Sequence, residues 1–271
     1  IITNLDSTAK SILIWRALLQ WLGGIGIIVM AITILPLLNI GGMQLFRMEN
    51  SDTAEKILPR TREVTFLISG VYLILTLVCG FSYWIFGMNI FDSIAHAMTT
   101  IATGGFSTYN DSIGFFENPK IEMVSIIFII FGSIPFLTYL KFIKGNKKIF
   151  FSDVQVRGLI YIVSLSVFIM FIYLLLNNKE YSFLENLRIS TFNVVSILSG
   201  TGYVTSDFSL WGKFPLIFFL FLMFIGGCAG STTCGIKIFR FQILGHFISN
   251  QIKKLVYPHG VFPMKYNKEK I

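Results

Sequence analysis

Charged side chains are scarce in this sequence, at 13% of 271 residues, whereas an ordinary soluble domain carries about 25%. Hydrophobic residues make up 54% of the chain. So few charges cannot cover a water-facing surface of this size, and the apolar excess must therefore face lipid. The composition excludes a soluble globular domain and predicts an integral membrane protein with membrane lipid as its surroundings.

Metal ligands and catalytic sets are also scarce. Cys79, Cys228 and Cys234 lie in or beside apolar runs without the spacing of a zinc site, and only three histidines occur. A third hypothesis, a multi-pass membrane enzyme, lacks support because no apolar run carries paired carboxylates, a Ser/His/Asp set or a metal-ligand cluster. We therefore expect no enzyme and no cofactor.

Acidic residues are fewer than basic ones, 14 against 22, which gives the chain a net charge of +8. A basic balance can indicate nucleic-acid binding when the charge gathers on one soluble face. Here the basic residues lie between long apolar runs. We expect no nucleic-acid partner and interpret the charge as a signal of membrane topology.

Long apolar runs are what the chain has in abundance. A transmembrane helix needs about 20 mostly apolar residues, and five stretches qualify, the last of them interrupted by glycines: 12–38, 64–86, 121–142, 159–176 and 214–248. Two shorter stretches, 91–108 and 184–205, each join a half-length apolar segment to a Gly/Thr/Ser cluster. They predict re-entrant segments, in which a half-helix enters the membrane and irregular backbone returns to the same side.

The basic residues set the expected orientation. Most of the 22 lysines and arginines fall in three segments, 46–62, 141–157 and 237–270. The positive-inside rule places these segments on the cytoplasmic side, so that both re-entrant segments enter from outside. We expect a multi-pass protein of a bacterial inner membrane.

The chain also repeats itself. One fixed shift places Gly105-Phe106 on Gly202-Tyr203 and Thr99 on Ser196. Because the shift preserves chain direction, the repeats are parallel. The expected fold is all-α, with repeats of span, re-entrant half-helix and span: residues 1–62 end an incomplete first unit, and 63–157 and 158–271 form two complete units.

The repeated turns have the composition of an ion filter. Such a filter needs carbonyl oxygens that replace the water shell of a cation, and glycine permits the backbone dihedrals this requires. The stretch Thr201-Gly202-Tyr203 resembles the potassium-channel T-V-G-Y-G loop with one residue fewer. An ordinary glycine-rich turn is the alternative. The candidate ion-binding residues are Thr103, Gly104, Gly105, Gly200, Thr201 and Gly202.

The glycine-rich run at 226–235 (GGCAGSTTCG) interrupts the last span. It lacks the phosphate-binding loop pattern, which leaves a close helix–helix contact or a break lining a water-filled cavity. We favour the break, with Ser231, Thr232 and Thr233 satisfying the freed backbone groups.

Few ionisable residues lie near the predicted half-helices. His96 either belongs to the ion path or is hydrogen-bonded within the bundle. Four acidic residues near the outer mouth could raise the local cation concentration or be solvated loop charges: Asp92, Asp111, Glu185 and Asp207.

Four motifs together resemble the membrane subunit of Trk/Ktr-type potassium-uptake proteins, most closely the TrkH branch. They are RALLQWLGGIGII from Arg16, GGMQLFR from Gly41, IATGGFST from Ile101 and IGGCAGST from Ile225. The resemblance runs over nearly the whole chain. It implies four units around one pore, each giving a filter turn with a central glycine, matched here by Gly105 and Gly202.

The resemblance carries further expectations. The interrupted span would match an intramembrane gate loop below the filter, with these residues: Gly226, Gly227, Gly230, Ser231, Thr232, Gly235 and Lys237. Potassium would be the transported ion, and the expected partners are a second copy in a homodimer and a cytoplasmic nucleotide-binding regulatory subunit. Against the family pattern, the first filter turn and the fourth unit are missing. A non-conducting fragment of such a transporter is the alternative function.

Overall fold

The computed structural model describes residues 4–33, 61–177 and 181–257, together with 260, 262, 265–266 and 269–270. The end of the first predicted span, the motif at 41–47 and nearly all of the predicted cytoplasmic loop 46–62 lie outside the described residues. In the predicted cytoplasmic segment 237–270, residues 258–259, 261, 263–264 and 267–268 also lie outside the described residues.

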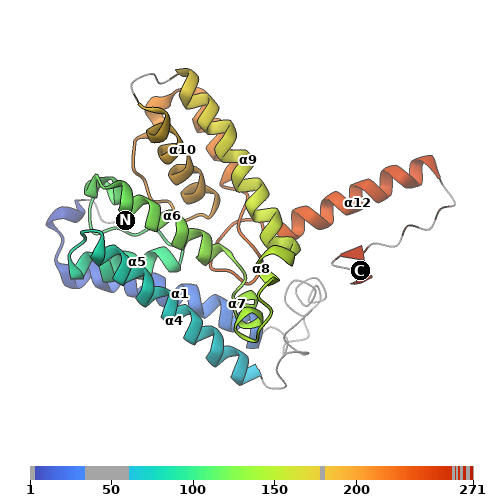
Figure 1. The fold of residues 1–271 in the computed structure, drawn as a ribbon, viewed down its shortest axis with the longest axis horizontal. Coiled ribbons are helices and arrows are strands. Elements are labelled where there is room, and N and C mark those ends of the chain that lie inside the picture. Colours follow the sequence, from blue (N-terminus) through green and yellow to red (C-terminus); the bar gives the residue numbers. More distant parts are fainter. Residues whose placement is uncertain are drawn as a thin grey trace.

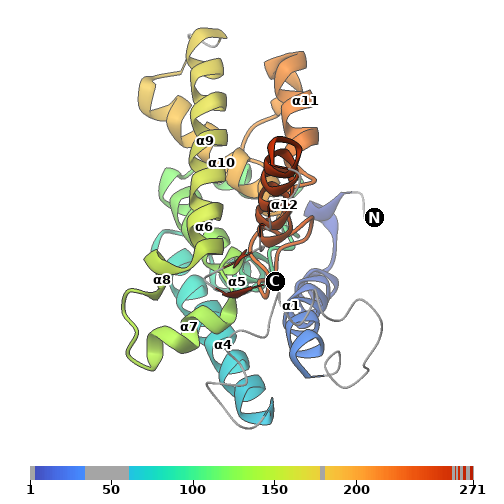
Figure 2. The ribbon, with the colours of Figure 1, turned by 90° about the vertical axis from the view of Figure 1, so that its right-hand side faces the viewer.

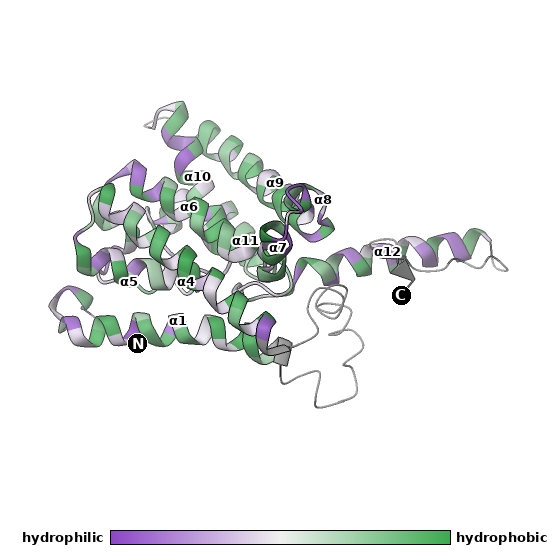
Figure 3. Ribbon diagram, turned by 60° about the horizontal axis from the view of Figure 1, so that its bottom comes forward, coloured by the Kyte–Doolittle hydropathy of each residue, from purple (hydrophilic) through white to green (hydrophobic). Residues whose placement is uncertain are grey.

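Among the residues that the structure describes, three single helices are long and apolar enough to cross a membrane: α1 (Lys10–Thr33), α4 (Thr61–Ile85) and α9 (Val154–Asn177). Their outer faces carry exposed large apolar side chains, among them Phe66 and Phe168. Figure 3 shows these helices as predominantly hydrophobic. Such faces are stable against lipid and not against water, so these three predicted spans are confirmed.

The predicted span at 121–142 is broken into two helices that together are long and apolar enough to cross a membrane. These are α6 (Pro119–Ser133) and α7 (Phe136–Ile143), bent by 89° at a short break. Pro135 explains the break, because proline lacks an N–H and disfavours helical backbone in the residue before it. Ile134 is accordingly extended, with ψ at 147°.

The two half-helices are α5 (Ile90–Ile101) and α10 (Phe183–Leu198). At about 1.5 Å per residue, neither spans a hydrocarbon core of about 30 Å. The side chain of Asn89 caps the start of α5, and Ser182 forms a capping box with Glu185 at the start of α10. Both half-helices end at a glycine-containing turn, as predicted.

The last predicted span is interrupted, as expected. It consists of α11 (Lys213–Leu222) and α12 (Ile238–Val256), joined by an irregular segment. Figure 1 shows α12 projecting away from the other helices. The remaining elements are short: η1 (Leu5–Ser7), η2 (Ser112–Phe116), α8 (Ile149–Ser152), η3 (Phe208–Trp211), β1 (Lys265–Tyr266) and β2 (Glu269–Lys270).

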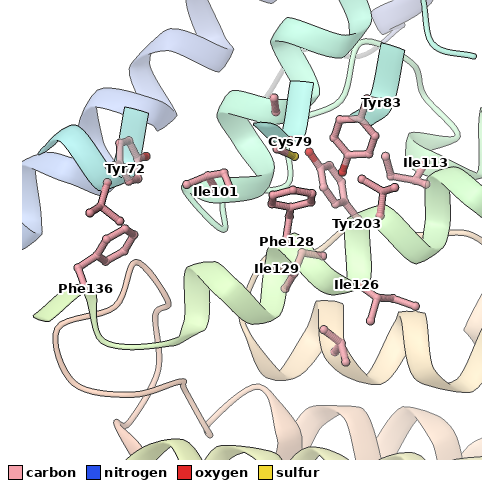
Figure 4. Close-up of a cluster of buried hydrophobic side chains, with 14 of the residues drawn as sticks. Tyr72, Cys79, Tyr83, Ile101, Ile113, Ile126, Phe128, Ile129, Phe136 and Tyr203 are labelled. Carbon is pink, nitrogen blue, oxygen red and sulfur yellow. The ribbon is translucent and has the colours of Figure 1, made fainter. Parts of the chain in front are cut away.

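Each half-helix is enclosed by neighbouring helices. α5 packs against α1, α4 and α6, and α10 packs against α6, α9 and α11. The arrangement around α10 can be followed in Figure 2. In the core around α4, α5 and α6, Tyr203 from the turn after α10 lies among Tyr83, Phe128 and Ile113 (Figure 4). The glycine turns are thus held inside the helix bundle.

Candidate functional site

The turn after α5 is closed by hydrogen bonds from its own helix. The backbone N–H of Gly104 donates to the Thr99 carbonyl at 2.8 Å. The Thr99 hydroxyl donates to the Phe106 carbonyl, also at 2.8 Å. A single helical residue thus fixes both the entry and the exit of the turn.

The turn after α10 repeats this arrangement. The N–H of Gly202 donates to the Ser196 carbonyl at 3.2 Å, and the Ser196 hydroxyl donates to the Tyr203 carbonyl at 2.7 Å. Thr99 and Ser196 are the residues that the sequence repeat pairs. Thr99 in one unit and Ser196 in the other therefore fix the turn that follows their helix through the same pair of hydrogen bonds.

Left-handed backbone occurs at matched places in both turns. Gly105 has a φ of 74° and Gly202 a φ of 81°, and Thr103 and Gly200 also have positive φ. The turns touch, because a Cβ atom at Gly105 would overlap the carbonyl oxygen of Thr201. A side chain at Gly105 is therefore excluded by both backbone conformation and space.

Both central glycines line one cavity of about 730 Å³. Asp111 and Asp207 contribute to its wall, as does Arg16 from α1. Hydrogen bonds from the Ser209 hydroxyl and backbone lower the pKa of the Asp207 carboxyl. The structure therefore brings Gly105 and Gly202 to a shared opening with a stable negative charge nearby.

The other acidic residues have different surroundings. Asp92 is neither a mouth charge nor a solvated one: it is 2% exposed and accepts from Thr108 and Tyr109 at 2.7 and 2.9 Å. Both expectations for Asp92 were wrong, because it holds the chain that leaves the turn. Glu185 belongs to the capping box of α10.

His96 is hydrogen-bonded within the bundle. Its side chain is fully buried, with Nδ1 2.9 Å from the Asp92 carbonyl and Nε2 2.9 Å from the Ser107 hydroxyl. Because a carbonyl only accepts, Nδ1 carries the proton and Nε2 accepts from Ser107. Of the two interpretations of His96, the structural one matches these contacts.

Sequence reasoning missed the Tyr203 hydroxyl. It lies 2.6 Å from the Thr99 hydroxyl and 3.1 Å from that of Thr100, and it donates to the His96 carbonyl at 3.2 Å. Tyr203 thereby ties the turn after α10 to the body of α5. A buried tyrosine O–H needs a partner, but the polar sequence around Tyr203 does not show that this side chain is buried.

Sequence reasoning also missed Gln20, which it noted only within a family motif. The Gln20 side-chain amide donates to the Gly104 carbonyl at 2.7 Å and accepts from the Phe106 N–H at 3.2 Å. A glutamine amide in a mostly apolar helix was the available signal, because its polar atoms require partners when they face other helices.

The segment between α11 and α12 is a loop with a narrow neck. Gly226 N–H donates to the Ile236 carbonyl at 2.9 Å, and Ile236 N–H donates to the Phe224 carbonyl at the same distance. The two ends of the loop, at Gly226 and Ile236, therefore lie side by side. This geometry matches the expected helix break and not a continuous helix with a tight contact.

The hydroxyl groups of Ser231 and Thr233 satisfy the loop's own backbone, as predicted, whereas that of Thr232 donates to carbonyls outside the loop. Ser231 donates to the Cys228 carbonyl at 2.6 Å, and the Thr233 hydroxyl accepts from Gly227 N–H at 2.9 Å. Lys237, which follows the loop, donates from Nζ to the Thr233 hydroxyl at 3.1 Å and also to the Thr233 carbonyl. Thr233 is the centre of this internal network.

The loop lies against both turns. Thr232 donates to the Ile101 carbonyl at the end of α5 at 2.9 Å and accepts from the Thr103 hydroxyl at 3.1 Å. The Cys234 thiol lies 3.8 Å from the Gly200 carbonyl. One short segment thus contacts the entry of each turn.

The break between α6 and α7 provides a seat for this loop. Cys228 N–H donates to the Ser133 carbonyl, and Phe136 N–H donates to the Gly230 carbonyl, both at 3.0 Å. The backbone groups left unpaired at the break between α6 and α7 therefore form hydrogen bonds with those of the loop between α11 and α12. This explains why a proline break is tolerated inside an apolar segment.

Comparison with known proteins identifies the family. A family model for TrkH, described as a cation transport protein, matches residues 1–271. The chain belongs to the TrkH family. It is 38% identical over 270 residues to the Trk system potassium uptake protein TrkI of Halomonas elongata, covering 99% of this chain and 54% of that protein. It is 36% identical to TrkH of Escherichia coli K12, covering 97% and 55%.

A solved structure agrees. The crystal structure of the potassium transporter TrkH from Vibrio parahaemolyticus matches with a TM-score of 0.87 at 36% identity, covering 98% of this chain and 55% of that one. The match confirms the expected fold class, a multi-pass, all-α membrane fold. TrkH proteins are transport proteins, in agreement with the expectation that this chain is not an enzyme. The chain spans about half the length of these relatives.

Proposed function

We propose that this chain forms half of a potassium-conducting pore. One observation carries the proposal: two turns at matched positions in the repeat, each with a left-handed central glycine, touch one another and line the same cavity. Ordinary glycine turns between helices have no reason to converge in this way. The names of the relatives, which are potassium uptake proteins, support potassium as the ion.

The proposed filter residues are Thr103, Gly104, Gly105, Gly200, Thr201 and Gly202. Their backbone carbonyls, apart from that of Gly104, which accepts from the Gln20 amide, would take over the coordination that water gives the ion in solution. Thr99 and Ser196 fix the turns through their hydroxyl and carbonyl groups. Because α5 and α10 direct their C-terminal ends at these turns, their dipoles would favour a cation there.

The proposed gate is the loop that includes Gly226, Gly227, Gly230, Ser231, Thr232, Gly235 and Lys237. Its contacts with Ile101, Thr103 and Gly200, where the chain enters the two turns, support a position directly beside the filter. Residues in this seat would obstruct an ion that leaves the filter. Conduction would require the loop to give up these hydrogen bonds.

The unit boundaries at residues 63–157 and 158–271 remain part of the proposal, as do the partners. The ring of four turns that the family resemblance implies needs two filter turns besides those after α5 and α10. The homodimer and the cytoplasmic nucleotide-binding regulatory subunit are expected from family membership. The alternative is that the chain is a non-conducting fragment of such a transporter. The relatives support this alternative equally, because the chain covers only 54% and 55% of their length.

Uptake of rubidium tests the proposal. The protein is expressed from its complete reading frame in cells that lack their own potassium uptake, and growth at low potassium is measured with rubidium influx. Gly202→Ser should abolish both, because a side chain at a φ of 81° distorts the turn. Gly23→Ser is the control, since Gly23 also has open space around a Cβ but lies outside the turns. Growth and influx unchanged by Gly202→Ser would refute the filter.

A further inference from the structure

Gln20 contacts the turn after α5 in an unusual way. Its amide forms two hydrogen bonds, to the Gly104 carbonyl at 2.7 Å and from the Phe106 N–H at 3.2 Å. These two backbone groups flank Gly105. The planar amide therefore bridges the central glycine and fixes the peptide groups on both of its sides.

The helix that carries Gln20 is itself held firmly at this level. The Trp21 indole donates to the Thr76 hydroxyl at 2.9 Å, and the Tyr72 hydroxyl donates to the Trp21 carbonyl at 2.9 Å. Both partners lie on α4. Because these contacts anchor the neighbouring residue, the Gln20 side chain projects from a fixed point toward the turn.

A second residue of α1 reaches the same turn. The Arg16 guanidinium lies over the Phe106 ring, 4.4 Å from its centroid. Arg16 and Gln20 are one helical turn apart and therefore share a face of α1. This face thus contacts the turn through both an amide clamp and a cation–π contact.

The clamp also bears on the other turn. Gly105 lies so close to Thr201 that a Cβ atom at Gly105 would overlap the Thr201 carbonyl oxygen. The position of Gly105 therefore limits where the Thr201 carbonyl can point. Displacing the peptide groups that Gln20 holds would shift an oxygen in each of the two turns.

We propose that Gln20 is a specificity-determining positioning residue of the filter. Through its amide clamp on Gly104 and Phe106, it sets the direction of the carbonyl groups that distinguish potassium from the smaller sodium ion. Discrimination of this kind depends on the number and placement of the oxygens around the ion. The inference rests on the proposed function and assigns a role to a residue outside the filter turns.

The test compares ion selectivity among variants of the protein expressed from its complete reading frame and purified into liposomes. Gln20→Leu removes both hydrogen bonds at similar size. Gln20→Glu keeps the acceptor for Phe106 N–H but loses the donor to the Gly104 carbonyl. Leu19→Ala is the control, because Leu19 is the adjacent residue and is 51% exposed. The readout is the potassium-to-sodium permeability ratio, with thermal unfolding in detergent measured alongside.

We expect Gln20→Leu to lower the permeability ratio by about fivefold, the effect of losing roughly one net hydrogen bond from the arrangement that prefers potassium. Gln20→Glu should lower it in the same direction, and Leu19→Ala should leave it unchanged. A merely structural role would reduce stability and total flux without moving the ratio.

An unchanged ratio in Gln20→Leu overturns the inference. Where that variant fails to fold, an unchanged ratio in Gln20→Glu overturns it equally. Failure of the proposed function gives a different result, because the wild-type protein would then conduct no potassium at all.

Discussion

Replacing Thr232 with valine tests the proposed gate most directly. Valine has nearly the shape of threonine but lacks the hydroxyl. That hydroxyl donates to the Ile101 carbonyl at 2.9 Å and the Gly132 carbonyl at 3.1 Å, and accepts from Thr103 at 3.1 Å. All three contacts join the loop to the underside of the turn after α5 or to the break after α6.

The magnitude follows from these contacts. A single hydroxyl proton shared between two carbonyls counts as about one hydrogen bond, and the bond accepted from Thr103 counts as a second. At about 1 kcal/mol net for each bond, the seated loop loses about 2 kcal/mol. An open loop surrounded by water loses little. The closed-to-open ratio should therefore fall by about 30-fold.

The assay is rubidium influx into liposomes that contain the purified protein without any regulatory partner. Thr232→Val should raise this basal influx well above that of the wild type, whereas Thr232→Ser, which keeps the hydroxyl, should stay near it. Equal influx from the valine and serine variants would refute the idea that these hydrogen bonds hold the gate closed.

Three further changes probe the site. Gly105→Ala should abolish rubidium influx while the protein still reaches the membrane, because the new Cβ overlaps the Thr201 carbonyl; influx near wild type would contradict the close contact. Tyr203→Phe should lower the free energy of unfolding by about 2 kcal/mol, seen in thermal unfolding in detergent against a Tyr181→Phe control; equal unfolding of the two variants would contradict a role for the Tyr203 hydroxyl. Asp207→Asn should raise the half-saturating potassium concentration at low ionic strength, because a carboxylate is lost from the cavity wall; no change would mean that the charge has no influence on entry.

The pH dependence of Asp207 supplies a matched check. Its pKa lies below the ordinary value because of its hydrogen bonds to Ser209, and an ordinary aspartate has a pKa of about 3.9. The carboxylate therefore stays almost fully charged well above that pH and is lost as the pH falls through and below it. Any contribution of Asp207 to potassium affinity should be constant from neutral pH down to about pH 5. A decline between neutral pH and pH 5 that disappears in Asp207→Asn would contradict this assignment.

The sequence by itself determined the membrane environment and most of the helices. Apolar runs of sufficient length predict spans because lipid offers backbone groups no alternative partner. Half-length runs that end in glycine predicted α5 and α10 for the same reason. The interruption at 226–235 was visible because glycines and hydroxyl residues replaced an apolar run.

Only the tertiary structure decided which groups meet. Pro135 was visible in the sequence, but a proline can kink a helix or end it, and the 89° bend depends on the loop that satisfies the broken backbone. Likewise, Asp92 was expected at the surface, and Gln20 and Tyr203 carried no sign of their partners. Hydrogen bonds between segments far apart in the chain have no periodicity to reveal them, so the clamp on Gly105 and the seat of the loop became apparent only from the packed helices.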